Sequence, residues 1–437
     1  MGFNVEEILN GGTIPDGWEI DNFCNYADTN RKSINSRNQP EHIRYIDISS
    51  VSTSSYEPPK KMMFPDAPSR ARRVVADGDT LISTVRPNLK AYAFIKKAQH
   101  NLIASTGFAV ISPKEPTDAR WVYYLITSKD FTDYLTRVAD GAAYPSFNPE
   151  HISSARVLVP SKKERSLIGD TLASLDDRIT LLRETNATLE AIAQALFKSW
   201  FVDFDPVRAK AEGREPEGMS AEVADLFPSE FEESELGEIP KGWKVGTLGD
   251  ILSIRNDRKK PSEGTIILPY VPIECITSKT IFLYDKKSGE EAQSSLIGFN
   301  EGDIVFGAMR PYFHKVCLAP FNGITRTTAF VLKPQKPSYK FFGLLQMFQD
   351  ETVAYATTHS EGSTIPYAKW SGSLDKKNII IPPESVAVMF NQTVESLFGQ
   401  GILNANQIGT LTELRDTLLP RLMSGKLRIP DLEEQAA

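Results

Sequence analysis

The fold is decided by a segment that reads, from Pro160 to Val202, PSKKERSLIGDTLASLDDRITLLRETNATLEAIAQALFKSWFV. Apolar or small residues recur along it with gaps that alternate between four and three positions without a break. This spacing is the period of a coiled-coil seam. It predicts one helix of about 40 residues, on the order of 60 Å long. The predicted seam positions are Ile168, Leu172, Leu175, Ile179, Leu182, Asn186, Leu189, Ala193, Leu196 and Trp200.

A second seam with the same spacing lies 222 residues further along the chain. It is weaker at Gly401, Asn404 and Arg415, and Leu414 is expected to compensate in part for Arg415. Two matching helices in one chain most economically pair antiparallel, with Asn186 restricting the register. The alternative is that each helix packs on its own domain. The second set of positions is Phe390, Val394, Leu397, Gly401, Asn404, Ile408, Leu411, Arg415, Leu418 and Leu422.

The two helices belong to a larger internal repeat. The sequence IPDGW at 14–18 recurs as IPKGW at 239–243, and VLVP at 157–160 recurs as IIIP at 379–382. Three further matches lie between these in the same order, and all five offsets fall between 221 and 225 residues. Matches in the same order at a nearly constant offset identify a duplication. The chain therefore contains two copies of one unit.

Each copy begins with a domain that reads as short strands separated by Gly, Pro, Asn and Asp turns, followed by helices. The fold class is therefore α/β in the mixed (α+β) sense, with a small curled sheet and helices at one end. The expected strands are Arg44–Ile48, Thr80–Val85, Ala91–Ile95 and Phe108–Ile111, and the expected helices are Trp121–Ile126, Phe131–Val138 and Tyr339–Phe348. The predicted boundaries are 1–159 for domain one, 160–202 for the first helix, 203–238 for a linker with one short helix at most, 239–381 for domain two, 382–427 for the second helix and 428–437 for a tail.

The charge distribution leaves a nucleic-acid partner open, although the formal net charge is −7. The linker 203–238 alone carries 12 acidic and 3 basic residues, so the two domains are neutral or mildly basic. Charge acts locally, over screening lengths of about 10 Å. The 3 cysteines lie far apart, as expected of reduced thiols. Without a signal peptide or a membrane-spanning run, the sequence predicts a cytoplasmic protein.

Catalytic motifs are missing from the sequence. It contains no phosphate-binding Gly-x-x-x-x-Gly-Lys-Ser/Thr loop, no amino-methyltransferase motif, no zinc spacing and no nucleophile elbow. The glycines at 399 and 401 resemble a cofactor loop but fall inside the second seam. We therefore expect a protein that is not an enzyme and holds no cofactor of its own.

Three segments resemble one known family: GEIPKGWK at 237–244, LFKSWFVDFDP at 196–206 and LLPRLMSGKL at 418–427. Together with the repeat, they make nearly the whole chain similar to the specificity (S) subunits of Type I restriction-modification systems. The resemblance implies that each domain is a target-recognition domain for one half of a bipartite, asymmetric double-stranded DNA site. It also implies that the paired helices set the spacer and dock two methyltransferase (M) subunits, with restriction (R) subunits joining. S-adenosylmethionine, ATP and Mg²⁺ are then expected on those partners.

Candidate DNA contacts occur at matching places in the two domains. One group combines cations, which can bind phosphates, with Asn, which can bind adenine edges. The alternative is a solvated charged turn, which has a similar composition. This group is Arg31, Lys32, Asn35, Arg37 and Asn38 in domain one, and Arg255, Arg258, Lys259 and Lys260 in domain two. A second group lies at and just after matching Arg-Pro pairs. For these arginines, a structural salt bridge is as good an interpretation as a DNA contact. The second group is Arg86, Asn88 and Lys90, against Arg310, Tyr312 and His314.

A third group lies in two proline turns, which are either groove-facing or ordinary turns. It comprises Tyr144 and Ser146 in domain one, and Ser363, Thr364 and Tyr367 in domain two. Lys60, Lys61, Arg72 and Arg73 are expected to contact phosphate. Trp200, Phe201 and Phe204 either close the coiled coil or form a docking patch for the M subunit, and exposed rings would favour docking. The competing hypothesis for the chain is a tandem scaffold that binds proteins or sugars.

Overall fold

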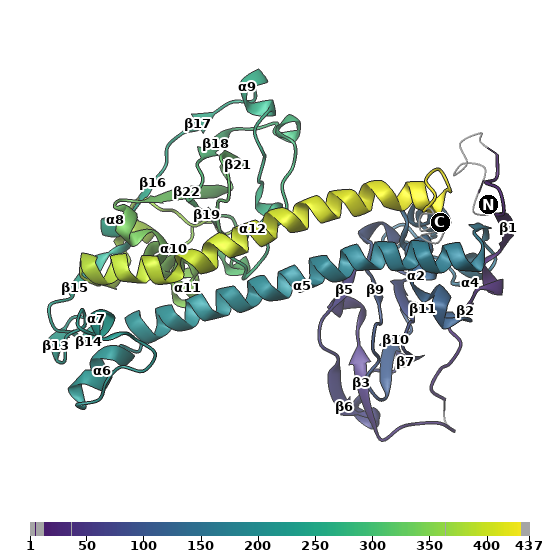
Figure 1. The fold of residues 1–437 in the computed structure, drawn as a ribbon, viewed down its shortest axis with the longest axis horizontal. Coiled ribbons are helices and arrows are strands. Elements are labelled where there is room, and N and C mark those ends of the chain that lie inside the picture. The colour runs from purple at the N-terminus through teal and green to yellow at the C-terminus, as the bar shows by residue number, and fades with distance from the viewer. Residues whose placement is uncertain (1–4, 6–12, 36, 363, 430–437) are drawn as a thin grey trace, which may run out of the picture. The chain divides into compact units, whose positions relative to one another are not determined.

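The computed structural model describes residues 5, 13–35, 37–362 and 364–429. The chain divides into two compact units, one made of residues 1–178 with 411–437 and the other of residues 179–410. Each unit contains one domain and one part of each long helix, α5 (Lys162–Phe201) and α12 (Glu384–Met423) (Figure 1). The heptad spacing therefore predicted both helices correctly.

Unit one contains two four-stranded sheets, with strand orders β2-β11-β8-β9 and β6-β3-β10-β7, where a single small sheet was expected. The two-stranded sheet β1-β12 pairs the residues after the IPDGW signal with the VLVP signal, so the ends of the repeat unit meet. The pair β4-β5 is a short hairpin. The strands are β1 Glu19–Asn22, β2 Ala27–Thr29, β3 His42–Ile46, β4 Val51–Ser52, β5 Ser55–Tyr56, β6 Lys60–Met63, β7 Ala71–Val74, β8 Thr80–Ser83, β9 Tyr92–Phe94, β10 Leu102–Ser105, β11 Phe108–Pro113 and β12 Arg156–Val159.

Helices α2 (Ala119–Thr127), α3 (Lys129–Arg137) and α4 (Glu150–Ser153) complete domain one. The rings of Trp121 and Phe131 are fully buried in its core. Ile168 and Leu172 of α5 and Leu422 of α12 belong to the same cluster of buried side chains. The helix ends in unit one are therefore part of the domain core.

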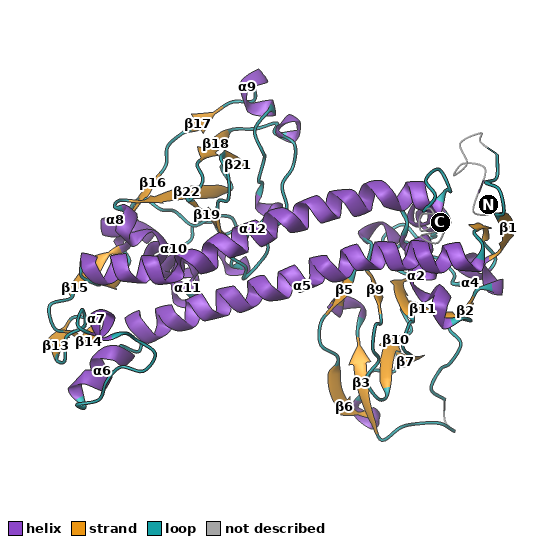
Figure 2. Cartoon of the chain, in the orientation of Figure 1, coloured by secondary structure: helices purple, strands orange, loops and turns teal. Residues whose placement is uncertain are grey.

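Unit two repeats this architecture with sheets β16-β22-β19-β20, β17-β18-β21 and β15-β23 (Figure 2). The linker 203–238 contains two short helices, α6 and α7, and most of the hairpin β13-β14, which is more structure than was predicted. The strands are β13 Phe231–Ser234, β14 Gly237–Pro240, β15 Lys244–Thr247, β16 Leu252–Ile254, β17 Arg258–Lys259, β18 Leu296–Phe299, β19 Ile304–Gly307, β20 Val316–Leu318, β21 Gly323–Arg326, β22 Ala329–Pro334 and β23 Asn378–Ile381. The helices are α6 Asp205–Ala211, α7 Ala221–Ala224, α8 Leu248–Ile251, α9 Glu263–Ile266, α10 Lys340–Phe348 and α11 Asp350–Thr358.

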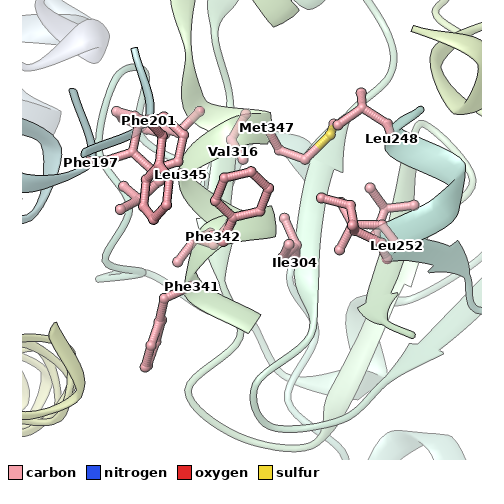
Figure 3. Close-up of a cluster of buried hydrophobic side chains, with 14 of the residues drawn as sticks. Phe197, Phe201, Leu248, Leu252, Ile304, Val316, Phe341, Phe342, Leu345 and Met347 are labelled. Atoms are coloured by element: carbon pink, nitrogen blue, oxygen red, sulfur yellow. The ribbon is translucent and has the colours of Figure 1, made fainter. Parts of the chain in front are cut away.

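The core of unit two is aromatic and includes the end of α5. Phe201 lies edge-on to Phe342 of α10, with ring centroids 4.9 Å apart (Figure 3). Trp200, Phe201 and Phe204 are 3%, 6% and 5% exposed. The docking role considered for these three rings is therefore wrong, because domain two covers them. The alternative, that they close the coiled coil, agrees with their burial and with the contacts of Trp200 and Phe201 with Phe390 of α12.

The two long helices run antiparallel within each unit. In unit one, Arg415 Nη1 donates to Asp176 Oδ1 at 2.7 Å, and in unit two Asn186 Nδ2 donates to the Gly401 carbonyl at 3.0 Å. All predicted seam residues are buried or half-buried. Leu414, in contrast, is exposed, so it does not compensate for Arg415. The helices thus pair with each other and also pack on the domains, which makes both predicted arrangements correct.

The duplication extends to unusual backbone conformations. Arg86 and Arg310 have φ values of 51° and 52°, and the residues four positions later, Lys90 and His314, have 54° and 50°. Left-handed backbone is uncommon for residues with a Cβ, so its recurrence at matching positions is a strong sign of common architecture.

Candidate nucleic-acid interface

Domain two has a groove of about 660 Å³ lined with cations. Arg258 and Lys260 line it from the segment around β17, and Tyr367 lines it from the proline turn. The structure therefore brings together two predicted groups that lie more than 100 residues apart in the sequence. Lys259 also lines the groove, but its ammonium lies 3.1 Å from the carboxylate of Asp257.

The guanidinium of Arg255 is held in an ion pair, so the predicted DNA contact of Arg255 is wrong. Its Nε and Nη2 donate to the two carboxylate oxygens of Asp303 at 2.6 and 3.0 Å. Asp303 is 3% exposed, so the guanidinium compensates a buried charge. Because this pairing is needed inside the domain, Arg255 supports the groove wall and does not act as a free cation.

The proline turn of domain two is held rigidly against the Arg-Pro turn. The backbone N–H of Arg310 donates to the Pro366 carbonyl at 2.7 Å, and the Tyr367 hydroxyl donates to the Thr327 carbonyl. Tyr312 and Thr364 are exposed beside these contacts. Arg310 is half-buried. Ser363, another predicted contact, lies outside the described residues.

His314 is buried, so its predicted DNA contact is wrong. Its Nδ1 lies 3.1 Å from Asp350 Oδ1, and its ring centroid lies 4.7 Å from that of Phe348. Burial lowers the pKa of His314, an effect that the nearby Asp350 carboxylate partly opposes. The neighbouring Tyr312, by contrast, remains accessible.

In domain one, the matching turns expose a tyrosine. The Arg86 guanidinium carbon lies 4.5 Å from the centroid of the Tyr144 ring, and Nη2 donates to the Ala143 carbonyl at 3.0 Å. Tyr144 is 69% exposed, and the predicted contacts Asn88, Lys90 and Ser146 are exposed as well. Arg86 N donates to the Pro145 carbonyl at 2.7 Å, as Arg310 does in the other copy.

The basic loop of domain one presents cations on a turn built by asparagines. The Asn38 side chain accepts from the Asn35 N–H at 2.6 Å, and the Asn35 side chain accepts from the Arg37 N–H at 2.9 Å. Both side-chain oxygens thus hold the turn, and Asn38 Nδ2 also donates to the Ser33 carbonyl at 3.3 Å. Arg31, Lys32 and Arg37 are exposed on it.

The remaining predicted phosphate contacts, four cations on β6 and β7, differ in their exposure to solvent and in their contacts within the domain. Lys60 and Lys61 are exposed on β6. Arg72 and Arg73 on β7 are half-buried: the Arg72 guanidinium lies 5.2 Å from the Phe64 ring centroid, and Arg73 Nη1 donates to Ser33 Oγ at 3.1 Å. Burial lowers the pKa of Arg73. Of the four, the two lysines are better placed to meet phosphate.

Comparison with known proteins identifies the family. Residues 15–191 match the family model of the Type I restriction modification DNA specificity domain. The Type I restriction enzyme MjaIX specificity subunit of Methanocaldococcus jannaschii is 28% identical over 376 residues, covering 82% of this chain and 80% of that protein. The HindI specificity subunit of Haemophilus influenzae is 28% identical over 417 residues, covering 83% and 89%. Residues 15–191 therefore belong to the Type I restriction modification DNA specificity domain family, and the chain as a whole is similar to Type I restriction enzyme specificity subunits.

The fold agrees with a solved member of the same family. The crystal structure of the Type I restriction-modification system S subunit from M. genitalium superimposes with a TM-score of 0.56 at 11% identity, covering 96% of this chain and 98% of that one. This likeness concerns the fold alone. It extends over the second copy of the repeat, which the family model does not reach.

Some residues that line the groove were not among the predicted contacts. Asn256, Lys369 and Trp370 also line the domain-two groove. Asn256 had a recognisable signal, because it lies between Arg255 and Arg258 in the basic segment, and Lys369 lies close to the proline turn. Within residues 13–35, 37–362 and 364–429, no group of three or more His, Cys, Asp or Glu side chains could hold a metal ion. Among the described helices, none combines the length and apolar character needed to cross a membrane.

Proposed function

We propose that the chain is the DNA-reading subunit of a Type I restriction-modification complex, in which each domain reads one half of a bipartite, asymmetric site. The observation that carries this proposal is that one backbone framework presents different exposed side chains in its two copies. Tyr144 in domain one corresponds to Ile365 in domain two, and Asn88 corresponds to Tyr312. A backbone framework that both copies share, with different side chains on its surface, is the pattern expected of two domains that read different DNA sequences.

The long helices would set the distance between the two half-sites. Half-sites read from one face of B-DNA lie about 34 Å apart, or a multiple of it. Helices α5 and α12 each contain 40 residues, hence about 60 Å at 1.5 Å per residue. Their antiparallel pairing within each unit supports a stiff spacer.

Two M subunits would dock on matching apolar stripes of these helices. Leu181 and Ile192 of α5 are 51% and 44% exposed, and their repeat equivalents on α12, Leu403 and Leu414, are 63% and 44% exposed. Residues eleven apart lie on one helix face. A partner that binds one stripe therefore has a second, equivalent site, which suits two copies of one enzyme.

Catalysis would then belong to the partners. The M subunits would bring S-adenosylmethionine, and R subunits would bring the ATP- and Mg²⁺-dependent steps. The alternative of a scaffold for proteins or sugars has no support among the relatives, which are named as specificity subunits of restriction enzymes.

The experiment is to express the chain with its cognate M subunit and map methylated bases in genomic DNA. We expect one bipartite motif, and replacement of residues 1–159 by the corresponding domain of a relative should change only one half of it. Deleting one heptad from both helices should alter the spacer. Absence of any chain-dependent methylation would refute the proposal, and a change in both halves would refute modular reading.

A further inference from the structure

The helix seam contains two buried polar layers. In the first, Asn404 Nδ2 donates to Asn186 Oδ1 at 2.9 Å, and Asn186 Nδ2 donates to the Gly401 carbonyl at 3.0 Å. Gln400 Nε2 completes the layer by donating to Asn404 Oδ1 at 2.8 Å. Both asparagines are buried, so each depends on the other helix for hydrogen bonds.

The second layer lies in unit one and is ionic. Arg415 Nη1 of α12 donates to Asp176 Oδ1 of α5 at 2.7 Å. The other oxygen of Asp176 accepts from the Tyr124 hydroxyl at 2.6 Å. Both charged side chains are mostly buried, at 23% and 20% exposure. This layer, like the first, joins polar side chains of both helices.

Neither layer is duplicated by the repeat. The offset of 222 residues places Ile408 at the position of Asn186, and Leu182 at the position of Asn404. It places Phe398 at the position of Asp176, and Ala193 at that of Arg415. All four of these equivalents are apolar and buried. The two helices therefore share a seam but carry complementary, unequal polar positions.

We propose that these layers make the seam selective: α5 accepts a helix of the α12 type and rejects a second copy of α5, and α12 does the converse. An antiparallel pair of two α5 helices in the observed register would place Asn186 opposite Leu182 and Asp176 opposite Ala193. An α12 pair would place Arg415 opposite Phe398. Each mismatch deprives a buried polar group of its partner on the other helix, which is unfavourable. Arg415 would keep only the carboxylate of Asp416 on its own helix, 2.7 Å from Nη2. A single buried Asn is known to select register and partner in coiled coils.

Selection of the unlike helix favours pairing within one chain, where the effective concentration is high. A pair of like helices would instead join two copies of one domain. If the chain reads DNA as proposed above, such a dimer would read a symmetric site, so the polar layers would preserve asymmetric recognition. The pairing rule itself does not depend on DNA binding, and its test uses none.

The test compares full-length chains after unfolding and refolding at equal concentration. The double variant Asn186→Leu with Asn404→Ile gives both positions the apolar character of their equivalents. We expect the fraction of dimer, measured by light scattering, to rise by about tenfold or more. A tenfold change in the dimerisation equilibrium corresponds to only about 1.4 kcal/mol of free energy. The control exchanges Leu182→Ile and Ile408→Leu, which alters an apolar layer, and should leave the monomer unchanged.

A cross-link identifies which helices pair. In a pair of two α5 helices, position 184 would face itself, whereas in the chain it faces α12. In a Cys24→Ser background, Glu184→Cys should therefore give bismaleimide-linked dimers with the double variant and not with the wild type.

The second variant, Asp176→Ala with Arg415→Ala, leaves the Asn layer intact and tests the ionic layer separately. The proposal is overturned if a folded variant of either layer gives the same dimer fraction and the same cross-links as the wild type. It is also overturned if the wild type itself forms cross-linked dimers.

Discussion

Arg255 binds both carboxylate oxygens of Asp303, whereas their repeat equivalents in domain one, Arg31 and Asp79, are not joined in this way. Arg31 is exposed. Asp79 is buried, burial raises its pKa, and one of its oxygens accepts from the Ala76 N–H at 2.8 Å. One sequence position thus stabilises the fold in one copy and remains available to a ligand in the other.

Replacing these two arginines should therefore have different effects. Arg255→Ala leaves the buried Asp303 carboxylate without its counter-ion, and we expect domain two to lose about 3 kcal/mol of unfolding free energy. Arg31→Ala should leave stability unchanged and weaken DNA binding. Urea unfolding and DNA affinity of the M-subunit complex measure the two effects. Equal loss of stability in both variants would contradict this assignment.

The cations of the domain-two groove should contribute to DNA binding through phosphates. For Arg258→Ala and for Lys260→Ala, we expect weaker binding and a reduction of about 1 in the slope of log affinity against log salt. Lys241→Ala is the matched control, because Lys241 is exposed and forms an ion pair with Glu230. Salt titrations of the M-subunit complex test this, and an unchanged slope in both groove variants would exclude phosphate contacts there.

Gly401 should tolerate no side chain, because a Cβ at this position would overlap the Phe282 ring. We expect Gly401→Ala to destabilise unit two by about 2 kcal/mol or more, as overpacking of a core does. Gly399→Ala is the control: its Cβ would meet nothing within 4 Å, and Ala in place of Gly stabilises an exposed helix by up to about 1 kcal/mol. Thermal unfolding measures both, and similar melting temperatures would show that Phe282 can move away.

The stability of unit two should fall as the pH rises towards 7, because of Glu190. Burial raises the pKa of this carboxyl from 4.5 to about 7, although its Oε1 accepts from the N–H groups of Ile281 and Phe282 at 2.8 and 3.1 Å. The folded state therefore binds a proton that the unfolded state releases. The resulting stabilisation is complete below pH 4.5 and lost as the pH passes about 7.

The variant Glu190→Gln should remove this pH dependence, worth on the order of 2–3 kcal/mol. Unfolding midpoints between pH 5 and 8 provide the measurement. Glu184→Gln, at an exposed position on the same helix, should keep the wild-type profile. If the Gln variant followed the wild-type curve, Glu190 would not be the titrating group.

The exposed helix stripes should bind the M subunits independently. Leu181→Asp places a charge in the stripe of α5, and Leu403→Asp does so in that of α12. Each variant should reduce the complex from two M subunits to one, and the two changes together should abolish it. Native mass spectrometry counts the subunits. Leu236→Asp, at an exposed leucine of the linker, is the control and should retain two.

The sequence predicted the regular elements of the fold well. The expected strand Phe108–Ile111 lies within β11, and the expected helix Trp121–Ile126 lies within α2. The linker was less well predicted, since its hairpin β13-β14 has no strong alternation of polar and apolar residues. Local periodicity is a property of neighbouring residues, which explains why it suffices for helices and core strands.

The site was predicted only in part, because the same residue types serve structure and binding. Arg258 and Lys260 line the groove as expected, whereas His314 and the ring of Phe201 are buried. Whether a side chain is free depends on distant segments, such as Asp350 beside His314 and Phe342 beside Phe201. No spacing in the sequence reports these neighbours.

The sequence by itself determined the duplication and the two heptad helices, since both are patterns of order and spacing along one chain. The tertiary structure alone decided which cations remain free and which polar residues pair across the seam. Those outcomes depend on contacts between residues far apart in sequence, such as Arg255 with Asp303 and Asn186 with Asn404. A buried polar group is stable only where folding brings it a partner, and that partner is known only once the chain has folded.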